Sequence, residues 1–191
     1  ASQHSRSRHR ARFCDAGRLR PGLDRSDARD RRQRLRAVLE RLAHETLRQG
    51  RTLLGCRPAA VQVATSKRAT AHALRAARVP VVPTFALSDG PPPLPGPWVV
   101  KPDDGAGCED TLVVADWRPA LARLQADPDR LVAQPWLDGT PMSLSLLCAE
   151  GRASLLACNL QHAHAVGGEL AVEGITVNAP LFGPATIITS A

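Results

Sequence analysis

The sequence contains no tyrosine, a single methionine and only two lysines, although lysine and arginine together number 25. Aromatic residues make up 3% of the chain, so its core has to be built mainly from alanine, leucine and valine. No run of 18 apolar residues occurs, so no transmembrane helix is predicted. A length of 191 residues fits one domain, or one and a half.

Cysteine is present, but its pattern excludes the usual disulfide and zinc motifs. The five cysteines are odd in number and contain no C-x-x-C pair, so neither a disulfide framework nor a zinc site is predicted. The N-terminus also lacks the apolar segment of a secretory signal. Reduced thiols in a cytoplasmic protein are the simplest interpretation.

Positive charge is concentrated at the N-terminus. Residues 1–36 carry a net charge of +8 and the remainder carries −1. The high isoelectric point of the chain therefore arises from its N-terminal segment. Residues 1–32 lack apolar periodicity and are predicted to form a disordered, arginine-rich arm. Two interpretations stay open: an arm that binds nucleic acid or an acidic membrane surface, or a non-native start such as a shifted reading frame. Phe13 is the only aromatic residue of the arm, which weighs against nucleic-acid binding.

Hydrophobic periodicity predicts a mixed order of helices and strands after the arm. Pro58 and Asp116 mark the starts of two helices, and Glu150-Gly151 joins two strands as a hairpin. The predicted helices cover 33–49, 58–64, 66–78 and 117–126, and the predicted strands cover 52–55, 79–84, 98–101, 111–115, 131–137, 143–149 and 154–162. Antiparallel hairpins in a mixed order favour the α+β class over a doubly wound sheet.

The two lysines, Lys67 and Lys101, indicate a binding site. Lys67 begins the third predicted helix, and Lys101 ends an apolar strand just before Asp104-Gly105-Ala106-Gly107. Where arginine supplies nearly all other cations, lysine is expected where a compact, flexible ammonium group is needed. Glycines allow close backbone approach and successive N–H groups bind anions, so this arrangement is typical of a phosphate site. The alternative is that both lysines are solvated, and neither a P-loop nor a full dinucleotide fingerprint is present.

Three segments, taken together, resemble the ATP-grasp superfamily. Ser66-Lys67-Arg68 and the later Val79-Pro80-Val81-Val82-Pro83-Thr84 are similar to its lysine-bearing helix and the segment that leads to its lid. Residues 98–111 resemble its strand, lysine and flexible glycine loop, and residues 131–145 resemble its adenine-binding strand. The resemblance extends from Leu35 to Asn178. Within the superfamily it is closest to carboxylate–amine ligases of the tyramine–glutamate ligase type.

This resemblance implies an ATP-grasp fold that is incomplete at both ends. Residues 33–65 would be a remnant of the domain that precedes ATP-grasp, and residues 66–191 a partial ATP-grasp domain with its lid at about 80–137. The implied ligands are ATP, Mg²⁺ and small carboxylate and amine substrates, with no membrane as a partner. The implied reaction forms an acyl phosphate from ATP and a carboxylate, which an amine then attacks. Such catalysis depends on positioning and charge neutralisation more than on a covalent residue.

The resemblance assigns four residues to the phosphates of ATP. Lys67 and Lys101 would neutralise the α- and β-phosphates. Gly105 and Gly107 would let their loop fold onto the β- and γ-phosphates. Cys108 lies in the same loop, where packing of a small residue is the simplest interpretation.

The resemblance assigns the nucleoside to the predicted strand 131–137 and the residue after it. Gln134 would face the adenine amino group, although the family has an acidic residue at this position. Backbone groups of Pro135, Trp136 and Leu137 would read the adenine edge. Asp138 is the only acid placed near the ribose.

The magnesium site is where the sequence departs most from the family. The family's ligands form a Glu…Glu-x-Asn cluster on late strands, which would lie beyond Asn178, and Glu169 and Glu173 do not have that spacing. Magnesium binds carboxylates and nucleotide phosphates, so the metal site is expected to be incomplete and no metal ligand is assigned. His162 and His164 are predicted to be hydrogen-bonded or solvated rather than to hold a metal.

Three functions therefore stay open. The chain resembles an ATP-dependent ligase, and the alternatives are a non-catalytic nucleotide-binding remnant and nucleic-acid binding through the arm. Protection of the body by ATP against thermal unfolding would favour either of the first two. Nucleic-acid binding that disappears on deletion of residues 1–32 would favour the third. No catalytic residue is assigned.

Overall fold

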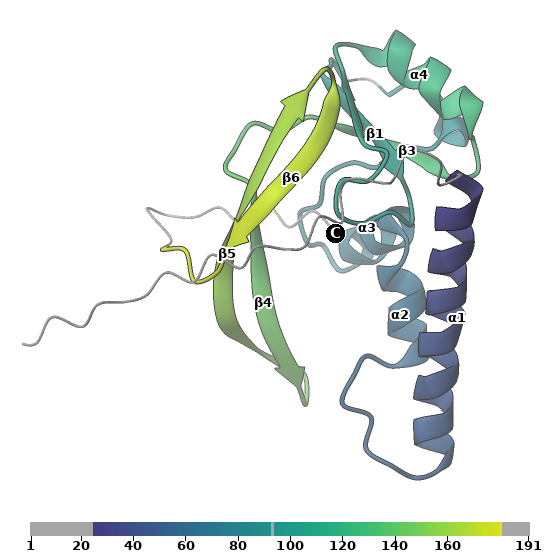
Figure 1. Cartoon of the computed structure of the whole chain (residues 1–191), viewed down its shortest axis with the longest axis vertical. Helices are drawn as coiled ribbons and strands as arrows, with labels where there is room; N and C mark the ends of the chain where they lie inside the picture. The colour runs from purple at the N-terminus through teal and green to yellow at the C-terminus, as the bar shows by residue number, and fades with distance from the viewer. Residues whose placement is uncertain (1–24, 93, 181–191) are drawn as a thin grey trace, which may run out of the picture.

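The computed structural model describes residues 25–92 and 94–180, although it leaves out the side chains of 25–36 (Figure 1). The helices are α1 (Arg25–Arg48), α2 (Pro58–Ala64), α3 (Lys67–Ala76), the short 3-10 helix η1 (Leu87–Asp89) and α4 (Trp117–Ala126). The strands are β1 (Trp98–Pro102), β2 (Leu112–Val114), β3 (Leu131–Pro135), β4 (Met142–Ala149), β5 (Arg152–Val166) and β6 (Glu169–Thr176).

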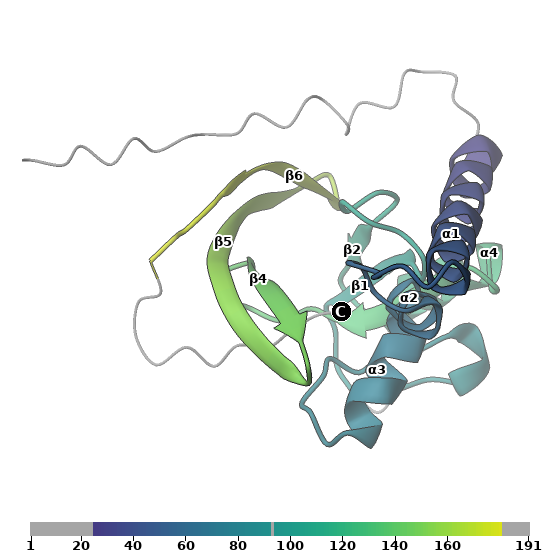
Figure 2. The same ribbon diagram turned by 90° about the horizontal axis from the view of Figure 1, so that it is seen from below.

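The six strands of the described residues form one sheet in the order β3-β1-β2-β6-β5-β4, and every pairing is antiparallel. This topology confirms the predicted α+β class. The halves β1–β3 and β4–β6 meet at one short pairing, Leu112 with Glu169. Figure 2 shows β4, β5 and β6 curling away as an arch, with α1, α2 and α3 at the opposite end of the molecule.

The main core lies between α4 and one face of β1 and β3. Side chains alternate along a strand, so β1 turns Trp98 and Val100 toward α4. The ring of Trp98 is fully buried and meets Phe85 and Trp117 edge to face, with centroids 5.9 Å and 5.1 Å away. The cluster consists of Trp98, Val100, Ala120, Leu124, Leu131 and Ala133. Half of the few aromatic side chains are thus gathered in one place.

Three predicted helices after the arm are confirmed to within two residues. Pro58 occupies the first turn of α2, as expected. Ser66 caps α3 by accepting a hydrogen bond from the Ala69 amide at 3.0 Å. Asp116 caps α4 by accepting one from the Arg118 amide at 2.9 Å.

The boundary between the arm and the body differs from the prediction. Residues 25–32, assigned to the disordered arm, are helical, and α1 begins at Arg25 rather than at 33. Four arginines and one alanine among residues 25–32 have good helix propensity, and Ser26 and Asp27 lie in the first turn, where short polar and acidic residues are favourable, so the helix extends past the apolar stripe on which the prediction rested. The rest of the predicted arm, residues 1–24, lies outside the described residues.

Two predicted strands were wrong and one was missed. Residues 52–55 are irregular and Leu54 is 96% exposed, because no strand of the described residues pairs with them. Residues 79–84 form no ladder, since two prolines remove backbone donors, and only Phe85 pairs, with Ala133. Strand β6 was missed, and β5 runs four residues beyond the predicted end at His162. The Gly167-Gly168 turn between β5 and β6 has positive φ at both glycines.

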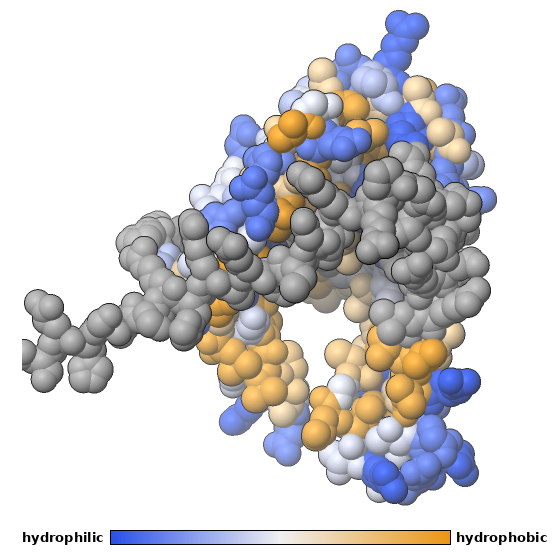
Figure 3. Space-filling model, viewed as in Figure 1, coloured by the Kyte–Doolittle hydropathy of each residue, from blue (hydrophilic) through white to orange (hydrophobic). Residues whose placement is uncertain are grey.

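Apolar side chains stay exposed in two regions of the described surface (Figure 3). Among residues 37–48 of α1, whose side chains are described, only Ala43 is buried, although the helix was predicted to be amphipathic. The exposed apolar side chains of these regions are Val38, Leu39, Leu42 and Leu47 on α1, and Leu146, Leu147, Leu155 and Leu156 at the end of the β4–β5 hairpin. Within the described part of the chain, no helix is both long and apolar enough to cross a membrane.

The loop between β1 and β2 is tied to the core by Asp110. Its carboxylate accepts hydrogen bonds from Arg123 of α4 at 2.7 Å and from Arg130 at 2.6 and 3.0 Å. All three side chains are largely buried, with 10–22% of each exposed. Ion pairs this far from solvent are held firmly, so the end of the loop is fixed relative to α4.

Replacing Asp110 with asparagine should destabilise the fold. Asp110→Asn removes the carboxylate shared by two largely buried guanidinium groups and leaves Arg130 with only its 3.5 Å contact to Asp127, so the free energy of unfolding should fall by roughly 2–3 kcal/mol. Asparagine tolerates the backbone at this position, where φ is +53°. Urea denaturation measures the change, with the exposed Asp129→Asn as a control that should shift stability by less than about 0.5 kcal/mol. Equal effects of the two substitutions would contradict this assignment.

Candidate functional site

The candidate site lies on the face of β1 and β3 that is turned away from α4. Strand pairing sets Lys101 beside Val132 and Val99 beside Gln134, and directly paired residues of antiparallel strands share a face. Trp98 and Val100 occupy the other face, in the core. Lys101 and Gln134, predicted separately from two segments, are therefore neighbours on one surface.

Lys101 is a partly buried cation with no close partner in the described part of the chain. Burial lowers the pKa of its ammonium group, and the nearby thiol of Cys108 acts in the opposite direction. The ammonium group of Lys101 forms no hydrogen bond and no ion pair with any of the described residues. A partly buried ammonium without a counter-charge is costly, so its position favours an anionic ligand.

Lys67 points at the backbone of the loop. Its Nζ donates hydrogen bonds to the carbonyl oxygens of Pro102 at 2.7 Å, Asp103 at 3.1 Å and Gly105 at 2.7 Å. The backbone amide of Lys67 donates to Asp103 O at 3.1 Å, and that of Arg68 donates to Asp103 Oδ1 at 2.9 Å. The start of α3 is thus fastened to the start of the glycine loop. The predicted contact of Lys67 with phosphate stays a prediction.

The two glycines of the loop are favoured for different structural reasons. Gly105 packs on Pro102, so that a Cβ at this position would lie 3.0 Å from Pro102 Cβ. Gly107 has φ of +66°, and a Cβ there would meet nothing within 4 Å. Gly107 therefore borders open space and adopts a conformation that favours glycine.

Cys108 also has a left-handed backbone, with φ of +61°. Burial raises the pKa of its thiol, while Lys101 and Lys67 act to lower it. The two lysines and this thiol therefore lie near one another. Non-glycine residues with positive φ are uncommon and concentrate at functional sites, which favours a specialised role for this loop.

Strand β3 and the residues after it place the predicted adenine and ribose ligands in different settings. Gln134 is buried, and its Nε2 donates to Thr84 Oγ1 at 2.8 Å. The amide of Trp136 donates to Pro97 O at 2.8 Å, and its indole donates to Asp138 Oδ1 at 3.0 Å. The Trp136 indole thus holds the Asp138 carboxylate in place.

The remaining two residues of that strand have fewer contacts. Pro135 pairs with Trp98 at the end of the β1–β3 ladder and has no amide hydrogen to donate. Leu137 is 49% exposed, and its backbone amide makes no hydrogen bond within the described residues. Its N–H is therefore a donor without a partner among the described residues.

The described residues do not provide a metal site. They contain no group of three or more His, Cys, Asp or Glu side chains placed to hold a metal ion. His162 bonds to Thr176 Oγ1 at 2.8 Å, and His164 lies 3.6 Å from Glu173, as two separate pairs. Asp104 Oδ1 is buried with no hydrogen-bond partner, but a single carboxylate is too few ligands for magnesium. The described residues thus do not fit a magnesium ion by themselves.

Sequence reasoning missed three residues that shape this site. Thr84 holds Gln134, Asp103 caps α3 from the loop, and Asp110 anchors the far end of the loop. No local pattern marks these residues, because each acts on a partner at least 13 positions away.

A family model described as "ATP-grasp domain" matches residues 64–191, which is more than half of the chain. The chain belongs to the ATP-grasp family. This result confirms the resemblance read from the three segments. The lysine-bearing helix, the glycine loop and the strand after it all lie within the matched residues. No curated protein matches the chain.

Solved structures support the same ATP-grasp fold. An L-amino acid ligase from Bacillus licheniformis is 19% identical with a TM-score of 0.50, over 62% of this chain and 29% of the ligase. A D-alanine-D-alanine ligase from Coxiella burnetii is 15% identical with a TM-score of 0.51, over 72% of this chain and 55% of the ligase. The chain thus spans between about a third and a half of these relatives, and at such identities the likeness shows the fold alone.

Removing the buried charge of Lys101 should stabilise the ligand-free ATP-grasp domain. Its pKa is lower folded than unfolded, so its charged form costs stability at neutral pH. Lys101→Met should raise the free energy of unfolding by roughly 0.5–2 kcal/mol. This is the usual gain when a residue that serves function at the expense of stability is replaced. This gain should be complete below the folded pKa and should shrink as pH rises from there toward 10.5, because the wild-type amine then becomes neutral.

Urea denaturation of Lys101→Met at several pH values tests this expectation. Arg118→Met, at an exposed cation of α4, is the matched control and should change stability by less than about 0.5 kcal/mol. A loss of stability in Lys101→Met would show that the ammonium group has a stabilising partner.

Replacing Lys67 should loosen the loop. Lys67→Met removes the donor shared by three loop carbonyls, so amide hydrogen exchange across residues 104–109 should speed up by roughly five- to tenfold. Lys101→Met should leave the exchange of these amides unchanged, because Lys101 makes no hydrogen bond to the loop. Hydrogen exchange followed by mass spectrometry distinguishes the two lysines, and identical profiles would contradict the separate roles.

Proposed function

We propose that this ATP-grasp chain binds ATP and contributes to an ATP-dependent ligation of a carboxylate to an amine through an acyl phosphate. The observation that carries the proposal is Lys101, a partly buried ammonium group without a partner among the described residues, next to a glycine loop that borders open space. A triphosphate supplies the anionic charge that such a position favours.

The nucleotide is proposed to lie along the Lys101 face, with its phosphates under the loop. Lys101 would contact the phosphates directly. Lys67 would hold the loop in shape through its three carbonyl contacts and lies close enough to Cys108 to add positive charge there. Gly107 leaves room above the loop for the phosphates. These groups would neutralise charge on the phosphates as the terminal phosphoryl group is transferred.

The adenine is proposed to lie at the far end of the same face. Gln134 donates through Nε2 to Thr84, which leaves its Oε1 as an acceptor for the adenine amino group. The Leu137 amide would donate to a ring nitrogen. Asp138, already bonded to the Trp136 indole, would contact the ribose through its second carboxylate oxygen.

The proposed reaction has two steps. A carboxylate oxygen of the substrate attacks the γ-phosphorus of ATP, which forms an acyl phosphate and releases ADP. The amine then attacks the acyl carbon, the amide bond forms, and inorganic phosphate leaves as the amine loses its proton. This chain supplies nucleotide positioning and charge neutralisation, and the pair of substrates is defined only as a carboxylate and an amine.

Lys101 gives the sharpest test of nucleotide binding. Lys101→Met should weaken ATP binding by roughly 1.5–3 kcal/mol, the value of a charge-assisted hydrogen bond, while the protein stays folded. Isothermal titration calorimetry measures the affinity, and Arg118→Met should bind ATP as the wild type does. Unchanged ATP affinity in Lys101→Met would show that the nucleotide binds elsewhere or not at all.

A further inference from the structure

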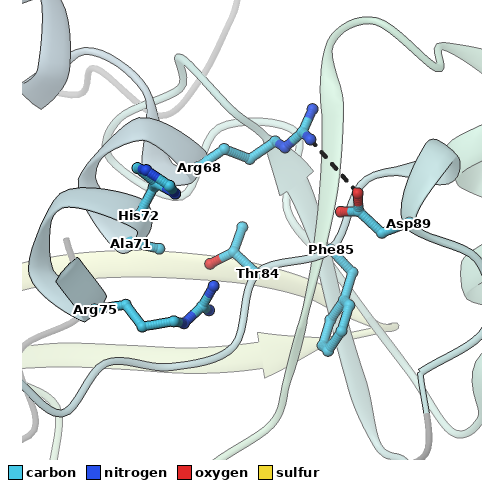
Figure 4. Close-up of a pocket in the computed structure, with 7 residues that line it drawn as sticks. All are labelled: Arg68, Ala71, His72, Arg75, Thr84, Phe85 and Asp89. Atoms are coloured by element: carbon cyan, nitrogen blue, oxygen red, sulfur yellow. Dashed lines mark ion pairs between the residues drawn. The ribbon is translucent and has the colours of Figure 1, made fainter. Parts of the chain in front are cut away.

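A cavity of about 340 Å³ lies between α3 and the segment 84–89 (Figure 4). The residues that line it are Arg68, Ala71, His72, Arg75, Thr84, Phe85 and Asp89. The cavity adjoins the candidate nucleotide site, because Thr84 lines it and also accepts the hydrogen bond from Gln134. No predicted role of the site residues uses this cavity.

One face of α3 supplies the polar wall of the cavity. Arg68, His72 and Arg75 are spaced i, i+4 and i+7, which places them on the same side of a helix. The helix contains no acidic residue. In Figure 4, Arg68 extends from α3 toward Asp89, and Arg75 extends toward Thr84.

The cavity has more positive than negative charge. Asp89 is its only acid, and it lies 3.6 Å from Arg68, longer than the 2.6–2.7 Å ion pairs of Asp110. Asp89 Oδ2 also accepts a hydrogen bond from the Ala86 amide at 2.8 Å. Within the described part of the chain, the guanidinium group of Arg75 forms neither a hydrogen bond nor an ion pair. The cavity is thus lined by two guanidinium groups and by one carboxylate that is already hydrogen-bonded.

We propose that this cavity is a second ligand site, which binds a small organic anion through a carboxylate or phosphate group held by Arg68 and Arg75. The planar guanidinium group matches both anions with paired N–H donors. Thr84 adds a hydroxyl, and Ala71 and Phe85 add apolar surface for the body of the ligand. The volume is at the small end of the range of ligand pockets, roughly 300–1,000 Å³. The ligand is therefore a small metabolite rather than a nucleotide.

Calorimetric titration of the full chain with inorganic phosphate and with succinate tests the proposal. Arg75→Gln should weaken binding of the preferred anion about tenfold, the effect of one charge-assisted hydrogen bond. Asp89→Asn should strengthen binding severalfold, because it removes the only carboxylate of the cavity but keeps the acceptor for the Ala86 amide. Arg118→Gln, at an exposed arginine of α4, is the control and should leave the affinity unchanged.

The two anions distinguish the possible sources of the ligand. Tighter binding of phosphate indicates a phosphorylated ligand, and tighter binding of succinate indicates a carboxylate. Titration with AMP-PNP, a non-hydrolysable ATP analogue, separates this cavity from the nucleotide site, since Arg75→Gln should leave AMP-PNP affinity unchanged.

Three results would overturn the proposal. The first is that neither anion binds at millimolar concentration. The second is that Arg118→Gln weakens binding as much as Arg75→Gln does, which would indicate an unspecific charge effect. The third is that Arg75→Gln weakens AMP-PNP as much as the anion, which would make the cavity part of the nucleotide site. Asp89→Asn keeps the test informative if Arg75→Gln unfolds, because its predicted effect is a gain of affinity.

Discussion

The three hydrogen bonds that Lys67 donates to the loop carbonyls connect parts of the chain that lie 35 to 38 positions apart. They fasten the start of α3 to the end of β1 and so set the shape of the glycine loop. They also fix the direction of α3, whose residues Arg68, His72 and Arg75 line the cavity beside the segment 84–89. Both proposed ligand sites therefore depend on this one ammonium group, which makes its role one of positioning at least as much as of charge.

Lys101 illustrates a conflict between stability and function. Its ammonium group is partly buried on the face opposite the aromatic core, and burial lowers its pKa. A methionine of similar length would suit this position better in the ligand-free protein. Retention of the charge is understandable if an anionic ligand provides the missing partner, because the cost in the free state then becomes affinity in the bound state.

Local signals predicted much of this chain and non-local pairing decided the rest. The caps Ser66 and Asp116 and the first-turn proline Pro58 fixed the starts of three helices, because capping depends on neighbours within one turn. Strand prediction failed where an element needed a distant partner. The segment 79–84 has β-branched residues but no usable edge, whereas β6 has weak propensity and is held by its pairing with β5.

The sequence by itself determined the family and the identity of the two lysines, because a compact cation beside a glycine turn is a local pattern in an arginine-rich chain. Only the tertiary structure decided what each lysine contacts. Lys67 turns to backbone carbonyls, Lys101 stays without a partner among the described residues, and Gln134 joins Thr84 across 50 positions. Such contacts depend on strand register and on the packing of α3, which no short segment specifies.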